Sequence, residues 1–267
     1  MPARKKKNLS KKDRQGLAII AGIGVVLLAL IGVRLAVGDS RAYDPETFCP
    51  VDGPTDHLAV LIDRSDSLSR TQAAVVRRRL EAAAADLDAG ERLSLFVLSD
   101  DDYDLEPLFS KCSPGDGTEA NALYQNPALI RRRFEEGFRQ PLDMALDEAV
   151  EGLAAGTSPI MEMMQVITTL PTFQPEDSAR RRLLIVSDML HNMPYFTQYA
   201  PNGADFEAFR RRAGREAPSA LLNGVDVQVI YLVRPGFTQF QGREHVEFWE
   251  RWIAEMGGRL TQTDRVR

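Results

Sequence analysis

The chain has 267 residues, of which 44% are hydrophobic and 27% are charged, and this length is enough to bury one good-sized core. Its net charge of -5 is unevenly distributed, because residues 1–15 carry seven cations and one acid, which leaves -11 on the remainder. Such an acidic body argues against nucleic-acid binding, so we expect no nucleic acid among the partners.

An uncharged apolar run of 18 residues, 16–33, follows the basic tail 1–15 and extends to residue 38 if the side chain of Arg34 reaches the membrane interface. A helix of this length can cross a bilayer, and the preceding cations keep the N-terminus in the cytoplasm. We therefore predict a single-pass anchor at 16–38 in the inner (cytoplasmic) membrane of a bacterium, with the main domain periplasmic or extracellular. A cleaved signal peptide is the alternative, because Ala36-Val37-Gly38 resembles a cleavage site.

Two cysteines, Cys49 and Cys112, are present, and both lie on the predicted outer side of the membrane. An even number of cysteines in an oxidising compartment predicts one disulfide, with two free thiols as the alternative. Cys49 falls in the segment 39–56, which is rich in proline and acidic residues and is typical of a linker.

The outer domain, 57–267, alternates short apolar runs with segments of helical periodicity, which predicts a doubly wound α/β fold with a mostly parallel central sheet flanked by helices. A stretch rich in Gly, Pro, Asn and Asp indicates an insertion around 100–127. We expect strands at 58–62, 92–99, 105–112, 182–189, 226–233 and 259–263, and helices at 71–88, 127–139, 141–153, 160–170, 204–215 and 244–256.

The run 58–62 stops at Asp63, and Ser65, Ser67 and Ser69 follow at a spacing of two. A carboxylate and hydroxyls beyond the carboxyl end of a parallel strand are hard oxygen ligands, where open α/β sheets bind their ligands. The alternative is a serine-rich cap on the following helix. A second buried strand, 182–189, likewise ends at an acid, Asp188.

Asp63-x-Ser65-x-Ser67 resembles the first motif of the von Willebrand factor A (integrin inserted-domain-like) family, where it begins a metal-ion-dependent adhesion site. Thr157 resembles the second motif and Asp188 the third, in the order that the family requires. The resemblance implies hydroxyl ligands from Ser65, Ser67 and Thr157, with Asp63 and Asp188 acting directly or through water. It further implies bound Mg²⁺, with Mn²⁺ or Ca²⁺ as alternatives, and a protein partner that offers an acidic side chain to the ion.

The third motif departs from the family pattern, since Met189 follows Asp188 where glycine is usual. For the second motif, the residues taken alone leave Thr157 and Ser158 as possible N-caps ahead of Pro159. Further on, Tyr195, Phe196 and Tyr199 form either a recognition surface or a cover for the sheet edge. His191 is expected to have no direct role, and Asp100, Asp101, Asp102 and Asp104 to form a solvated acidic turn rather than a calcium loop.

We expect a membrane-anchored extracytoplasmic module that captures a protein partner through a divalent metal, and not an enzyme. A Mg²⁺-dependent hydrolase or phosphatase using the strand-end aspartates is one alternative. It lacks support from a phosphate-binding glycine loop, a nucleophile elbow or a suitably placed lysine. A structural component of a membrane complex, whose metal site has lapsed, is the other alternative.

Overall fold

The computed structural model describes residues 11–37, 42–65, 67–98, 106–118, 120, 126–150, 157–173 and 179–267. The chain divides into two compact units, Met1–Ala42 and Tyr43–Arg267. In the first unit, helix α1 (Lys11–Val37) contains the window Gln15–Val33, with a mean hydropathy of 2.8. Within the described residues this is one helix long and apolar enough to cross a membrane, judged by length and composition.

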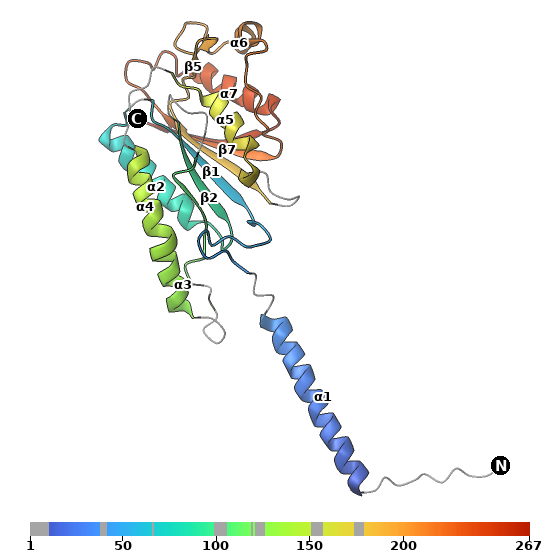
Figure 1. The fold of residues 1–267 in the computed structure, drawn as a ribbon. Coiled ribbons are helices and arrows are strands. Elements are labelled where there is room, and N and C mark those ends of the chain that lie inside the picture. The colour runs from blue at the N-terminus through green and yellow to red at the C-terminus, as the bar shows by residue number, and fades with distance from the viewer. Residues whose placement is uncertain are drawn as a thin grey trace, which may run out of the picture. The chain divides into compact units, whose positions relative to one another are not determined.

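The second unit is built on a six-stranded sheet with the order β3-β2-β1-β4-β7-β8 (Figure 1). β3 runs antiparallel to β2 at one edge, and every other neighbouring pair is parallel. The strands are β1 (His57–Asp63), β2 (Arg92–Leu98), β3 (Phe109–Cys112), β4 (Arg181–Ser187), β7 (Val225–Leu232) and β8 (Arg259–Val266). A separate two-stranded ribbon consists of β5 (Asn192–Met193) and β6 (Phe196–Thr197).

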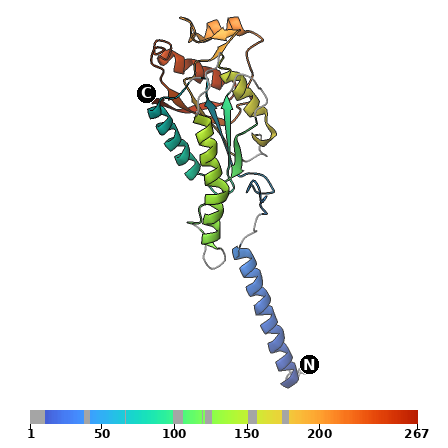
Figure 2. The same cartoon turned by 60° about the vertical axis from the view of Figure 1, so that its left-hand side comes forward.

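Helices cover both faces of the sheet (Figures 1 and 2). On one face, α2 and α4 pack against Leu58, Val60 and Ile62 of β1; on the other, α5, α6 and α7 pack around Ala59 and Leu61. Burial on both sides explains why the strands are continuous apolar runs, as in other parallel sheets. The predicted doubly wound α/β fold class is confirmed. The helices are α2 (Arg70–Ala85), α3 (Pro127–Arg133), α4 (Gln140–Val150), α5 (Ile160–Thr169), α6 (Phe206–Ala213) and α7 (Arg243–Glu255), with a short 3-10 helix η2 (Pro171–Phe173).

The two helices predicted around Pro141 are joined without a break, so the expected helix boundary there is wrong. Between α3 and α4 lies a wide helical turn, η1 (Phe134–Arg139), in which the N–H of Gln140 bonds the carbonyl of Glu135, five residues earlier. Proline cannot donate the usual helical hydrogen bond and normally kinks or ends a helix. The π-type turn directly before Pro141 changes the bonding pattern at that point, so the chain continues as a helix.

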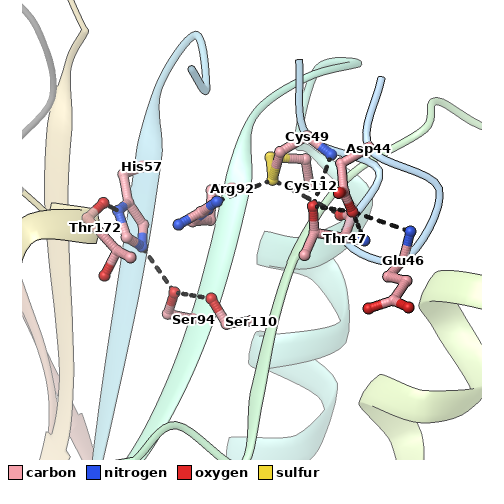
Figure 3. Close-up of a disulfide and its surroundings, with 10 residues drawn as sticks. All are labelled: Asp44, Glu46, Thr47, Cys49, His57, Arg92, Ser94, Ser110, Cys112 and Thr172. Atoms are coloured by element: carbon pink, nitrogen blue, oxygen red, sulfur yellow. Dashed lines mark hydrogen bonds between the residues drawn. A yellow bond between two sulfur atoms is a disulfide. The ribbon is translucent and has the colours of Figure 1, made fainter. Parts of the chain in front are cut away.

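The predicted disulfide is present and joins Cys49 to Cys112, the last residue of β3 (Figure 3). Residues 43–56, which the sequence assigns to a linker, lie in the same compact unit as the sheet. The N–H of Cys112 donates to the carbonyl of Thr47 over 2.8 Å, and a Cβ on Gly137 would come within 2.5 Å of the Phe48 ring. The segment is thus held against β3 and η1. The acidic run 100–104 lies outside the described residues.

Candidate metal centre

Three loops meet beyond the carboxyl ends of β1 and β4. These strands are parallel neighbours, with Ile62 opposite Val186, so Asp63 and the Ser187-Asp188 pair leave the sheet side by side. The loop before α5 joins them, because Ser158 and Asn192 exchange two backbone hydrogen bonds of 3.0 and 3.1 Å. Segments far apart in the sequence thereby converge at the carboxyl ends of the strands, where α/β proteins bind ligands.

Asp63 is buried, with 2% of its surface exposed, and both carboxylate oxygens accept hydrogen bonds. Its Oδ1 accepts from the N–H of Ser65 over 2.9 Å. Its Oδ2 accepts from the hydroxyl of Ser187 over 2.8 Å and from that of Ser158 over 3.3 Å. These bonds fix the carboxylate at the end of the strand.

The residues predicted as hydroxyl ligands lie in the loops that follow β1 and precede α5. Ser65 is buried two residues after Asp63, Ser67 is exposed, and Thr157 is half-buried next to Ser158, whose hydroxyl reaches Asp63. Asp66, between the two serines, lies outside the described residues. The structure therefore places the first and second motifs at the same edge of the sheet.

The capping alternative applies to one serine of this stretch. Ser69 is the N-cap of α2: its hydroxyl accepts from the N–H of Gln72 over 3.2 Å, and the Gln72 side chain accepts from the N–H of Ser69. This is a capping box, which accounts for Ser69 without Ser65 or Ser67. The N-cap of α5 is Pro159, which makes no side-chain cap hydrogen bond, so neither Thr157 nor Ser158 occupies the N-cap position.

Asp188 is the second buried carboxylate, with 1% of its surface exposed. Its Oδ1 accepts from the N–H of Leu190 over 2.8 Å, and its Oδ2 accepts from Nε of Arg234 over 3.0 Å. Burial, followed by the charge of Asp63, raises the pKa of Asp188 to about 7 despite these donors. Two carboxylates that repel one another in a buried place are a set that an additional cation stabilises.

Met189 takes the left-handed backbone conformation that glycine adopts most easily, with φ of 60°. Its side chain is buried in the core with 1% exposure, and its carbonyl accepts from Nε1 of Trp249 over 3.0 Å and from the N–H of His191 over 3.0 Å. Core packing and these two bonds hold the turn in place of a glycine. The chain therefore makes a sharp turn after Asp188 although the residue there is methionine and not glycine.

Two side chains that sequence reasoning missed complete this edge, Arg234 and Gln241. Arg234 follows the end of β7, and besides Asp188 its Nη1 donates to the carbonyl of Ser67 over 2.8 Å. Gln241 donates to the carbonyls of Asp188 and Leu232 over 3.1 and 2.8 Å. The signal that identified Asp63 and Asp188, a charged residue directly after an apolar strand, was also present at Arg234.

Two residues of the loop after Asp188, the buried His191 and the half-buried Tyr195, form a polar cluster with the half-buried Glu162 of α5. The Tyr195 hydroxyl donates to Oε1 of Glu162 over 2.8 Å and lies 2.9 Å from Nε2 of His191. Burial lowers the pKa of His191 to about 3 and raises that of Glu162. Since a buried neutral histidine holds Tyr195 in place, His191 has a structural contact here.

The neighbouring aromatic residues largely cover the sheet. Phe196 is buried among Phe209 and Phe248, whereas Tyr199 packs edge-on against Phe237, with ring centroids 5.2 Å apart. Phe237 is 41% exposed. The sequence left open whether these aromatic residues cover the sheet or form a recognition surface. Phe196 covers the sheet, whereas the exposed ring of Phe237 lies next to Tyr199.

The donor set is consistent with a hard divalent ion held by oxygen. Within the described residues, no group of three or more His, Cys, Asp or Glu could hold a metal ion. The candidate set instead combines the two carboxylates of Asp63 and Asp188 with neutral hydroxyls of Ser65, Ser67 and Thr157, which are ligands that Mg²⁺ accepts along with water. The buried, mutually repelling carboxylates fit such an ion on grounds of charge.

A serine–histidine contact does occur elsewhere, at the opposite end of β1 (Figure 3). Nδ1 of His57 lies 2.8 Å from the carbonyl of Thr172, so this nitrogen carries the proton and Nε2 accepts from the hydroxyl of Ser94 over 2.8 Å. The Ser94 hydroxyl is in turn 2.9 Å from that of Ser110. Ser94 is 1% exposed within the sheet, which leaves no room for a substrate, so the contact is structural.

A mixed sheet of mostly parallel strands flanked by helices, with oxygen donors gathered beyond β1 and β4, is the architecture that the resemblance to the von Willebrand factor A family implies. The chain has a von Willebrand A-like fold. No family model matches its sequence, and no curated protein matches it.

Several solved structures resemble this von Willebrand A-like chain in fold. BatB from Bacteroides thetaiotaomicron is 13% identical, with 79% of this chain and 90% of that chain covered and a TM-score of 0.41. The SpRpn10 VWA domain is 9% identical, with coverages of 79% and 88% and a TM-score of 0.39. Proximal thread matrix protein 1 from the mussel byssus, described with a zinc-occupied MIDAS motif, is 8% identical, with coverages of 78% and 48% and a TM-score of 0.38. An aerotolerance-related membrane protein from Bacteroides fragilis is 14% identical, with coverages of 79% and 92% and a TM-score of 0.32.

Proposed function

We propose that this protein is a membrane-anchored binding module that captures a protein partner through a divalent ion. The proposed ligands are Asp63, Ser65, Ser67, Thr157 and Asp188, and the proposed ion is Mg²⁺, with Mn²⁺ or Ca²⁺ as alternatives. The observation that carries the proposal is the convergence of two buried carboxylates, close enough for the charge of Asp63 to raise the pKa of Asp188.

The proposed role is binding and not catalysis. A divalent ion with few charged ligands stays electrophilic and attracts a further carboxylate. An acidic side chain of the partner is the matching group, although the body of the domain is itself acidic. Local attraction at the ion would then oppose the long-range repulsion between two acidic surfaces, which salt screens.

The proposed location is the outer side of the cytoplasmic membrane, with residues 16–38 as the anchor and the N-terminus in the cytoplasm. Two features support this topology: the basic residues that precede the apolar helix, and the Cys49–Cys112 disulfide, since such bonds persist in oxidising compartments.

The test of the metal site is a Mg²⁺ titration of the full chain in detergent, followed by its unfolding temperature. A ligand that binds the native state raises this temperature by mass action. We expect a rise that disappears in Asp63→Ala. A matched control is Asp226→Ala, which removes a carboxylate paired with Arg259 at the amino end of β7 and should leave the rise intact. No rise at millimolar Mg²⁺, or an equal rise in Asp63→Ala, would contradict the proposal.

The test of partner capture is a pull-down from membrane extracts with Mg²⁺ and with a chelator. Proteins recovered by the wild-type chain in Mg²⁺ only, and by Asp226→Ala but not Asp63→Ala, are the expected partners. Recovery that is the same with the chelator would show that capture does not use the metal.

One observation favours a second candidate, a structural component of a membrane complex that uses no metal. The guanidinium of Arg234 already contacts Asp188, and a protein cation at this position could take the place of a metal ion. In that case Mg²⁺ would change neither the unfolding temperature nor partner recovery.

A further inference from the structure

Arg234 is a buried cation inside the candidate site. It is 8% exposed, and its guanidinium bridges two loops: Nε donates to Oδ2 of Asp188 over 3.0 Å, and Nη1 donates to the backbone carbonyl of Ser67 over 2.8 Å. Arg234 itself stands directly beyond β7, so one side chain connects the loops that follow β1, β4 and β7.

The backbone around Arg234 is also held in position. Its N–H donates to Oε1 of Gln241 over 2.7 Å, while Nε2 of the same glutamine donates to the carbonyls of Asp188 and Leu232. Gln241 is 1% exposed. Because both the main chain and the side chain of Arg234 are fixed by buried partners, the arginine is a built part of this edge and not a surface residue that happens to lie near it.

The charges of these groups do not balance. Asp63 and Asp188 carry two negative charges when both are ionised, and Arg234 supplies one positive charge. The arginine therefore offsets part of the repulsion between the carboxylates, and one negative charge remains for a further cation to neutralise. A divalent ion bound to the two ionised carboxylates in the presence of Arg234 would give a net charge of +1. Without Arg234, the same ion and carboxylates would give a net charge of zero.

We propose that Arg234 is an internal cation that tunes the metal site: it holds Asp188 in the metal-free protein, weakens binding of the divalent ion, and leaves the loaded site electropositive toward an acidic partner. This inference rests on the proposed function. Its physical basis is twofold. A fixed positive charge repels a divalent ion across the low-dielectric interior, and one oxygen of Asp188 is already committed to Nε.

The variant Arg234→Gln removes the charge, and Arg234→Lys keeps it while losing the two-point bridge. We expect Arg234→Gln to bind Mg²⁺ about tenfold or more tightly than the wild type, and Arg234→Lys to stay within about threefold of it. Both variants should have a lower unfolding temperature without metal, because each loses a buried charged hydrogen bond. Arg243→Gln is the matched control: it removes an exposed arginine paired with Glu247 and should change neither quantity.

The measurement is a MgCl2 titration of the full chain in detergent, read by tryptophan fluorescence. The chain has two tryptophans, and Trp249 donates to the carbonyl of Met189 next to Asp188, so its emission reports on the site. Unfolding temperatures in chelator give the second readout, which needs no bound metal.

The outcomes separate the two proposals. If the wild type binds Mg²⁺ and Arg234→Gln binds it equally or more weakly, the role of Arg234 is overturned and the metal site stands. If only Arg234→Gln binds Mg²⁺, the inference about Arg234 stands and the metal-dependent function of the wild type falls. If neither binds, both are overturned.

A second comparison keeps the test decisive if Arg234→Gln does not fold without metal. In the pair Asp188→Asn and Asp188→Asn/Arg234→Gln, residue 188 carries no charge, so the removal of Arg234 does not leave the carboxylate that it paired with buried alone. The inference predicts tighter Mg²⁺ binding in the double variant than in Asp188→Asn. Equal or weaker binding in the double variant would overturn it.

Discussion

At the scale of single residues, variants of Met189 distinguish the contribution of backbone conformation to stability from that of side-chain packing. Met189→Gly and Met189→Ala both lose a buried side chain, which costs about 2–4 kcal/mol of unfolding free energy. Glycine adopts a φ of 60° without strain, so we expect Met189→Gly to be more stable than Met189→Ala by about 1 kcal/mol. Chemical denaturation of both variants measures the difference.

Met164 provides the control for this comparison. It is equally buried but lies inside helix α5, where glycine is about 1 kcal/mol worse than alanine. The order of stability should therefore reverse, with Met164→Ala above Met164→Gly. If the alanine variant is the more stable one at both positions, the backbone of Met189 is not strained.

His57 predicts a pH dependence of stability. Burial lowers the pKa of His57 from 6.5 to about 4, so the folded protein keeps this histidine neutral while the unfolded chain protonates it below pH 6.5. Its contribution to stability is present above pH 6.5 and is lost as the pH falls toward 4. The raised pKa of Asp188 acts in the opposite direction over an overlapping range, so the histidine must be isolated by mutation.

The variant His57→Gln removes the titrating group. Between pH 7 and pH 4.5 we expect the wild type to lose about 2 kcal/mol of unfolding free energy relative to this variant. Urea denaturation at a series of pH values gives the two profiles. Parallel profiles would mean that His57 titrates normally in the folded protein.

At the scale of elements, the Cys49–Cys112 disulfide holds the segment before β1 to the end of β3. The two cysteines are 63 residues apart in sequence, so reduction releases a long loop in the unfolded chain, worth about 4 kcal/mol by loop entropy. We expect Cys49→Ser/Cys112→Ser to lower the unfolding temperature under oxidising conditions, and a reductant to affect only the wild type.

The same double variant should leave Mg²⁺ affinity unchanged. Cys112 pairs with Arg92 at the start of β2, whereas Asp63 is at the far end of β1, about 20 Å away along the strand. A large change in affinity would indicate that the two edges of the sheet are coupled.

At the scale of the whole molecule, helix α1 predicts how the protein partitions in cells. An uncleaved anchor should keep the full chain in the membrane fraction after alkaline washing, with residues beyond 42 accessible to protease from the outer side. Mass measurement of the purified chain checks the alternative, since cleavage after Ala36-Val37-Gly38 would remove the basic tail and the helix. A chain that lacks its first 38 residues would contradict the anchor.

Several features of this protein were determined by the sequence alone. Continuous apolar runs predicted strands buried on both faces, because parallel strands covered by helices expose no polar side. The acids that ended two of these runs, Asp63 and Asp188, predicted where polar side chains would converge. An even number of cysteines predicted the disulfide. These signals are local in the sequence, and each has one simple physical cause.

Other features were decided only by tertiary structure. The continuous helix across Pro141 depends on a π-type turn, and the sharp turn at Met189 depends on core packing that offsets an unfavourable φ. The contact of Arg234 with Asp188 depends on the order of strands, which places the ends of β4 and β7 side by side although 46 residues separate the two side chains. Sequence patterns record what each segment prefers, but the partners of a strand-end side chain are set by which strands become neighbours.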